Sequence, residues 1–110
     1  MRSLRLLMLT ALALAACGIE VPHDKTDYIG RWKHANMSLW ITAQGHVEYQ
    51  RVEGRGTTSI SAPLRGFDGY DFEVGIGWMS TRFDVSTPPH RDYGSWKMVV
   101  DGVELTRVED

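Results

Sequence analysis

The 110-residue chain contains a single cysteine, Cys17, and only four prolines. With one cysteine no disulfide can form within the chain, so an oxidising compartment would give the fold no covalent cross-link. Helical periodicity is also missing, because no window after Cys17 carries apolar residues at three-and-four spacing over three turns. These absences exclude a disulfide-stapled scaffold and a helical bundle.

No apolar run is long enough to span a bilayer, which needs about 20 residues. The longest run, from Leu6 to Ala16, is interrupted by Thr10 and follows Arg2 and Arg5. A positive start followed by a short apolar stretch is typical of an export signal. We therefore expect residues 1–16 to be a signal peptide.

This stretch ends in Leu14-Ala15-Ala16-Cys17, which resembles the lipobox of bacterial lipoproteins. In that family the signal is removed before the cysteine, which then carries the lipid. The resemblance implies lipidation of Cys17 and attachment to a membrane of the cell envelope. Gly18 stands where an aspartate often marks inner-membrane retention, which favours the outer membrane facing the periplasm. The alternative is an ordinary secretory signal with a chance cysteine after it.

The rest of the chain is mildly acidic and forms one domain. Removal of residues 1–16 takes away two arginines and changes the formal net charge from −2 to −4. This mildly acidic charge argues against a nucleic-acid partner, which would require a basic patch, and we expect none. Residues 17–27 contain Pro22, several charges and few large apolar side chains, which is typical of a tether. We expect a lipidated tether over 17–27 and a compact domain over 28–110.

Apolar and polar residues alternate throughout this domain, which predicts antiparallel strands with one face on a core. We expect an all-β fold, either a small antiparallel meander barrel or a strongly curved sheet of about eight short strands. The predicted strands cover residues 29–33, 37–42, 46–52, 57–62, 70–78, 80–86, 95–100 and 103–108. The predicted inward side chains include Leu39, Tyr49, Phe72, Trp78, Phe83 and Met98. At this chain length they would fill the interior, although a ligand cavity stays the alternative.

Turn residues predict the register of two hairpins. Asp101-Gly102 is a strong signal for a two-residue turn, which pairs Met98 with Leu105 and Trp96 with Arg107. The loop Ala43-Gln44-Gly45 needs three residues, with its glycine in the left-handed region, to pair Leu39 with Tyr49 and Ile41 with Val47. Pro88-Pro89 predicts a loop before the last hairpin.

The start of the domain, Tyr28-Ile29-Gly30-Arg31-Trp32, contains a Gly-x-Trp on the first predicted strand. With the residues through Tyr49 it resembles the lipocalin-like or calycin group of β-barrels. In that group the tryptophan closes one end of the barrel and an arginine of the last strand lies across its ring. The resemblance implies a structural role for Trp32 and Arg107, but no ligand is carried over, because the ligand-binding residues of avidins have no counterpart here.

Residues that could support catalysis or metal binding do not form a set. The four histidines are scattered, and the best pair of metal ligands, His46 and Glu48 on one strand face, lacks a third and a fourth partner. No serine lies in a nucleophile elbow, and the single cysteine is assigned to the lipid. We therefore expect no enzyme activity, no catalytic residue and no cofactor.

The remaining candidates lie in two loops, residues 88–93 and 54–58, which we expect to be adjacent and to form one binding surface. The first contains His90, Arg91 and Tyr93 beside two prolines, and the second contains Arg55. Rigid polar loops often carry recognition sites, although a solvated connection between hairpins is the simpler and favoured explanation of both loops. The sequence thus predicts a non-catalytic, lipid-anchored binding module for a small apolar ligand or an envelope protein. The alternative is a structural or assembly factor that docks to an envelope complex.

Overall fold

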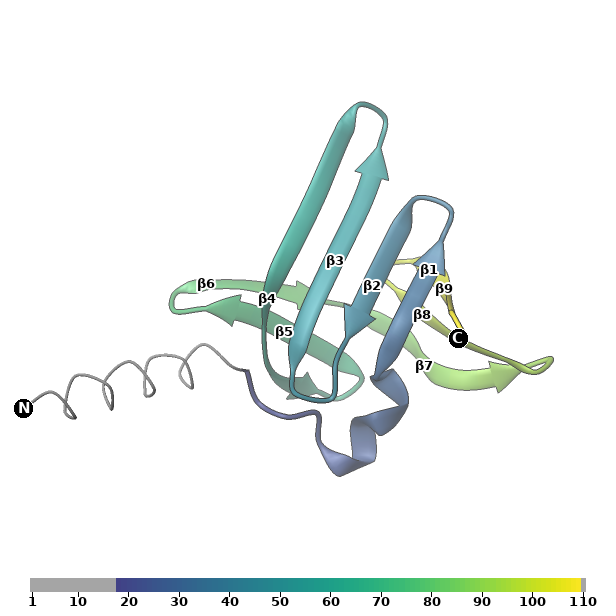
Figure 1. The fold of residues 1–110 in the computed structure, drawn as a ribbon, viewed down its shortest axis with the longest axis horizontal. Coiled ribbons are helices and arrows are strands. Elements are labelled where there is room, and N and C mark those ends of the chain that lie inside the picture. Colours follow the sequence, from purple (N-terminus) through teal and green to yellow (C-terminus); the bar gives the residue numbers. More distant parts are fainter. Residues whose placement is uncertain (1–17, 110) are drawn as a thin grey trace, which may run out of the picture.

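The computed structural model of the chain describes residues 18–109, so the predicted signal peptide and Cys17 lie outside the described residues. One short 3₁₀ helix precedes nine strands (Figure 1). The elements are η1 (His23–Tyr28), β1 (Gly30–His34), β2 (Met37–Ile41), β3 (His46–Glu53), β4 (Gly56–Asp68), β5 (Asp71–Ile76), β6 (Met79–Phe83), β7 (Val85–Asp92), β8 (Ser95–Val100) and β9 (Val103–Arg107). Among residues 18–109 no helix is sufficiently long and apolar to cross a membrane.

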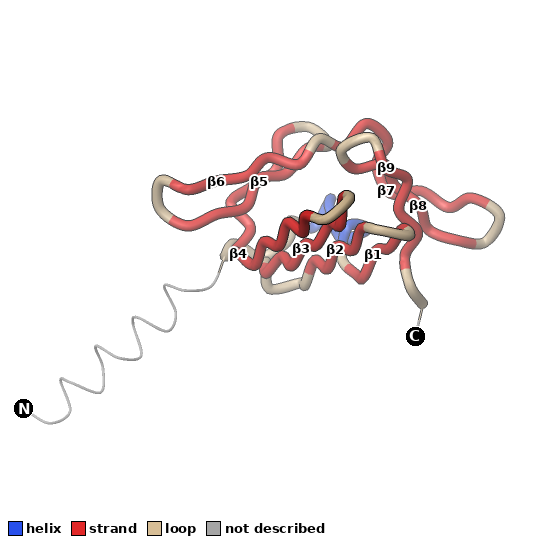
Figure 2. The backbone as a smooth tube through the Cα atoms, turned by 90° about the horizontal axis from the view of Figure 1, so that it is seen from above, coloured by secondary structure: helices blue, strands red, loops and turns tan. Residues whose placement is uncertain are grey.

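All nine strands belong to one antiparallel sheet with the order β6-β5-β4-β3-β2-β1-β9-β8-β7. The sheet curls into a half-barrel, as Figure 2 shows from above. Its two terminal strands, β6 and β7, follow one another along the chain with only Asp84 between them. The predicted all-β, strongly curved antiparallel sheet is confirmed, with nine strands in place of about eight.

Both predicted hairpin registers are confirmed on the core side. Leu39 pairs with Tyr49 across β2 and β3, and Gly45 in the connecting turn has a φ of 86°. Met98 pairs with Leu105 across β8 and β9, where Asp101 and its following glycine both have positive φ. Two consecutive residues with positive φ are the hallmark of a type I′ turn, whose twist matches that of the strands.

Strand β4 extends beyond its predicted range of 57–62, because it bends and changes partner. Residues 56–63 pair with β3, whereas residues 64–68 pair with β5. The register shifts between Leu64 and Gly66, which marks an irregularity of the β-bulge type. A bulge increases local twist and bends a strand, so the two halves of β4 diverge and carry β3 and β5 apart.

The single strand predicted over 70–78 is wrong at its end. β5 stops at Ile76, and Gly77 and Trp78 form a two-residue turn into β6. Trp78, predicted to point inward, is 91% exposed. Gly77 has a φ of 61°, and glycine at the first central position is the usual choice for a type II′ turn. The turn at Gly77-Trp78, and not the alternation of apolar and polar residues, therefore decides that the Trp78 side chain is exposed.

The loop predicted at Pro88-Pro89 is also wrong, because both prolines lie within β7. This strand pairs with β8 through two register shifts, between Val85 and Thr87 and between Thr87 and His90. Proline lacks an N–H donor and is tolerated at sheet edges and bulges. β7 has both features, being a terminal strand of the sheet and irregular at the two prolines.

The segment expected to be a tether is packed against the sheet from Gly18 onward. Ile19 N donates to Leu64 O at 3.2 Å, and Val21 N donates to Ala43 O at 3.1 Å. A methyl group added at Gly18 would overlap the carbonyl of Gly45 and the backbone of Leu64. The first described residues of the predicted tether, from Gly18 to Val21, therefore contact β4 and the β2–β3 turn.

The concave face of the sheet is covered by one cluster of buried hydrophobic side chains. Trp32 lies in it with no exposed surface, and its indole Nε1 donates to Tyr28 O at 2.9 Å. The guanidinium carbon of Arg107 lies 5.6 Å from the Trp32 ring centroid and 4.8 Å from that of Trp96. Burial raises the pKa of Tyr28 to about 12, with smaller contributions from Tyr70 and Asp71. The other predicted inward residues, Leu39, Tyr49, Phe72, Phe83 and Met98, are buried in the same cluster.

Candidate functional site

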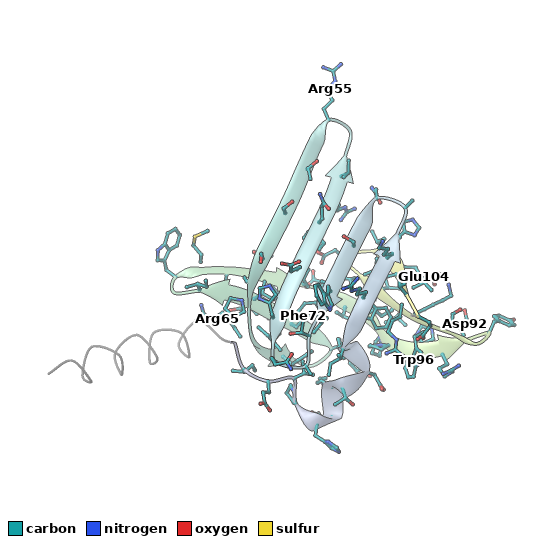
Figure 3. All side chains as sticks on the ribbon, viewed as in Figure 1. Arg55, Arg65, Phe72, Asp92, Trp96 and Glu104 are labelled. Carbon is teal, nitrogen blue, oxygen red and sulfur yellow. The ribbon has the colours of Figure 1, made fainter. Side chains whose placement is uncertain are left out.

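The residues predicted to form a binding surface lie on two separate hairpins. Arg55 is at the tip of the β3–β4 hairpin, whereas His90 and Arg91 lie in β7 and Tyr93 in the turn to β8. Figure 3 labels Arg55 and Asp92, which lie at the ends of hairpins that project in different directions. The structure therefore keeps Arg55 away from the β7–β8 turn.

Within the β7–β8 hairpin, two of the predicted side chains are held by their own hairpin. His90 Nδ1 lies 3.0 Å from Pro88 O. Arg91 donates to Gly94 O at 3.2 Å and has its guanidinium carbon 5.7 Å from the Trp96 ring centroid. Tyr93 has a φ of 51° and is fully exposed. This hairpin thus presents one aromatic side chain rather than a convergent polar set.

A serine, a histidine and a glutamate come together on the outer face of β3 and β4. Ser61 Oγ lies 3.3 Å from His46 Nε2, and the same nitrogen lies 3.4 Å from Glu48 Oε1. A catalytic triad needs the acid on one ring nitrogen and the nucleophile on the other. Here both contact Nε2, and all three residues are exposed. The arrangement is a surface hydrogen-bond cluster, and residues 18–109 contain no group of three metal-ligating side chains.

The β5–β6 hairpin, in contrast, carries large hydrophobic side chains that are exposed to solvent. Ile76, Trp78 and Met79 are 68%, 91% and 60% exposed. Along β5 the buried residues Phe72 and Val74 share the parity of Ile76. The alternation therefore continues past the end of the core, and its last apolar members have nothing to pack against. We call Ile76, Gly77, Trp78 and Met79 the hairpin tip.

A groove of about 500 Å³ separates the hairpin from the first half of β4. It exists because β4 bends, so its upper half rises beside β3 while β5 and β6 project sideways (Figure 1). This volume falls within the range of sites that bind small molecules. Ile60 and Ala62 line one side, and Val74, Ile76, Trp78 and Met79 line the other.

Backbone and side-chain contacts fix the shape of the hairpin. Arg65 Nη1 donates to Gly77 O at 2.6 Å, and Arg65 Nε lies 3.9 Å from Glu73 Oε1. Gly75 has a φ of 152°, and a Cβ at that position would overlap the backbone of Met79. The tip is consequently held in position by groups of β4 and β5.

The sequence contained a signal for this turn. Gly75-Ile76-Gly77 places two glycines inside an alternating run, and glycine in a strand often marks a close backbone approach or a turn. Interpreting Gly77-Trp78 as a turn would have predicted that Trp78 is exposed. The groove, by comparison, depends on the bend of β4, for which the sequence offers only Gly66.

Three charged groups connect the two terminal strands of the sheet. Arg82 Nη2 donates to Asp68 Oδ2 and Asp71 Oδ2, both at 3.0 Å, and Val85 N donates to Asp71 Oδ1 at 2.7 Å. The backbone hydrogen bond from Val85, followed by that from Arg82, lowers the pKa of Asp71. Asp71 thereby links β5 to the β6–β7 junction.

The domain should therefore lose stability in acid through Asp71. Its folded-state pKa lies below that of the unfolded chain, about 3.9. The contribution is thus present above about pH 4 and lost as the pH falls through the folded-state value. Urea unfolding at several pH values should show that Asp71→Asn is less stable than wild type at pH 7 and that the difference shrinks towards pH 2. Asp24→Asn, at an exposed site on η1, is the control, and equal acid sensitivity in the wild type and Asp71→Asn would refute the role of Asp71.

Comparison of the chain with protein-family models, with curated proteins and with solved structures gave no match, so the interpretation of these surfaces depends on their chemistry alone.

Proposed function

We propose that this chain is a lipid-anchored, non-catalytic binding module of the cell envelope. Features of the sequence support the envelope location: positively charged residues near the N-terminus, a short apolar stretch and a lipobox-like Leu14-Ala15-Ala16-Cys17. Lipidation of Cys17 would attach the domain to a membrane, with the outer membrane facing the periplasm as the favoured location.

The binding role is supported above all by the exposed apolar hairpin tip and its groove. Large apolar side chains that cluster in the open generally mark an interaction site. Trp78 and Met79 also border a concavity of ligand-binding size. All of the predicted inward side chains except Trp78 are buried in one cluster that fills the interior. The groove, which is lined by the exposed hairpin tip and by Ala62 and Val74 at the edge of that cluster, is therefore the better candidate for an apolar ligand.

A catalytic role has weaker support. The cluster that most resembles a catalytic set, Ser61 with His46 and Glu48, is exposed and has the wrong connectivity. A general base must be within reach of the proton that it removes and needs an environment that tunes its pKa. We accordingly propose that the domain functions by binding alone.

Titration with a fluorescent fatty acid tests the proposal. The purified chain should bind it saturably, and Ile76→Ser/Met79→Ser should weaken binding at least tenfold, because two apolar contacts of the groove are removed. Trp40→Ser is the matched control, since Trp40 is an exposed aromatic residue outside the groove. Unsaturable binding, or equal affinity in the groove variant and the control, would contradict binding in the groove.

The second candidate is a structural or assembly factor that docks to an envelope protein. It is favoured by Tyr93, which is fully exposed at a hairpin turn with a left-handed backbone. Tyrosine supplies large contact area at interfaces with little loss of conformational freedom. In this alternative the β7–β8 turn, and not the groove, would be the contact surface.

A further inference from the structure

We propose that the hairpin tip is a second membrane contact, so that Ile76, Trp78 and Met79 enter the interfacial layer of the bilayer that holds the lipid anchor. This inference extends the proposed function, on whose lipidation of Cys17 it rests. It assigns the exposed apolar residues to a lipid surface and gives the domain a fixed orientation on the membrane.

The first argument is the position of Gly18 and Ile19 beside β4. Ile19 N donates to Leu64 O, and Leu64 N donates to Gly45 O at 2.7 Å. The next residue, Arg65, donates from its guanidinium to Gly77 O in the hairpin tip. The first described residues are thus connected to the tip through two consecutive residues of β4.

Strand geometry confirms that the tip is close to this point. Leu64 pairs with Val74 of β5, and Ile76 lies two residues further along the same strand. At a rise of roughly 3.3 Å per residue this separation is about 7 Å along β5. In Figures 1 and 2 the described chain starts on the side from which the β5–β6 hairpin projects. Residue 17 directly precedes Gly18 in the chain. A membrane that holds a lipid on residue 17 would therefore lie close to the hairpin tip.

The second argument is the chemistry of the tip. Residues 74–81, Val-Gly-Ile-Gly-Trp-Met-Ser-Thr, contain no charge. Tryptophan is enriched at membrane–water interfaces, where its ring is partly apolar and its N–H stays hydrated. Ile19, 44% exposed beside Leu64, adds apolar surface near the anchor. Arg65, at the base of the hairpin, is half exposed, and an arginine stem can lie on apolar surface while its charge reaches polar headgroups.

The third argument is the geometry of attachment. Gly18 is packed against Gly45 and Leu64. A lipid on residue 17 would therefore hold the domain directly at the membrane, without a flexible linker between them. The domain surface around β4 and the β5–β6 hairpin would be pressed against the headgroups. Two membrane signals on one body bind more stably than either signal alone. These conditions favour a bilayer as the occupant of the tip over a soluble partner.

Tryptophan fluorescence in reconstituted vesicles tests the inference. The full-length gene is expressed, the protein is extracted from membranes and it is placed in vesicles of phosphatidylcholine with or without bromine on shallow acyl carbons. Bromine quenches only an indole that lies in the bilayer, and the chain has four tryptophans. We expect bromine-dependent quenching in the wild type, and we expect Trp78→Phe to remove most of it. Trp40→Phe, an exposed tryptophan on β2, should retain it.

The outcomes separate this inference from the proposed function. Flotation of the protein with the vesicles but equal quenching of wild type and Trp78→Phe would overturn the inference and leave the anchor intact. Failure to float would contradict lipid anchoring itself. Fatty-acid binding in the groove without any quenching would assign the hairpin tip to a soluble ligand or protein and also overturn the inference.

Discussion

Trp32→Ala should lower the free energy of unfolding by about 3–5 kcal/mol, the cost of removing a buried aromatic side chain and leaving a cavity. Trp32 has no exposed surface, and its indole supplies the donor to Tyr28 O. Its replacement by alanine also removes one of the two rings that Arg107 covers. A domain has a total stability of about 5–15 kcal/mol, so this loss removes a substantial part of the free energy of unfolding.

Urea denaturation followed by circular dichroism measures this effect. Trp40→Ala is the control, because Trp40 is 38% exposed and has the guanidinium carbon of Arg31 4.3 Å from its ring centroid. An exposed cation–π contact contributes about 0.5–1 kcal/mol. Similar denaturation midpoints for Trp32→Ala and Trp40→Ala would show that Trp32 is not a central packing residue.

Cys17→Ser should abolish fatty-acyl labelling and leave residues 1–16 attached. A serine hydroxyl cannot replace the thiol on which lipobox processing depends in the family that this segment resembles. Each buried methylene of an acyl chain contributes about 0.8 kcal/mol to membrane binding, so the complete loss of the chains should release any correctly folded domain that depends on them. Metabolic labelling with palmitate and the mass of the purified protein measure both effects.

Thr10→Ser is the matched control, because it changes a hydroxyl residue within the apolar stretch and leaves the lipobox untouched. It should be labelled and processed like the wild type. An ordinary secretory signal would give a cleaved but unlabelled wild-type protein. Persistent palmitate labelling of Cys17→Ser would likewise show that the lipid is not on this cysteine.

Local sequence patterns were sufficient to predict strand pairing wherever the two paired strands are joined by a short turn. The Asp101-Gly102 and Ala43–Gly45 turns determine the pairing of Met98 with Leu105 and of Leu39 with Tyr49, because a turn type leaves only one register for the strands beside it. The packing of Arg107 over Trp32 agrees with the geometry that the calycin resemblance implies. The family membership itself stays a prediction.

The candidate site was accessible to sequence analysis only in part. Arg55 and Tyr93 were predicted to be close, but they lie on separate hairpins because the strands that carry them diverge. Trp78 was predicted to be inward because alternation shows which face a side chain takes and does not show where the core ends. The prolines of β7 were interpreted as a loop, because their tolerance depends on β7 being a terminal strand.

The sequence by itself determined the all-β class and the two hairpin registers, since each depends on residues close together in the chain. The export signal and the lipidation of Cys17 stay predictions. Only the tertiary structure decided that the segment after Gly18 is packed and that β4 bends between two partners. It also decided that Ile76, Trp78 and Met79 extend beyond the core. The physical reason is that burial depends on which strands meet across the curled sheet, and the bend at Leu64–Gly66 separates β5 and β6 from the upper half of β4, leaving an apolar hairpin exposed beside the start of the described chain.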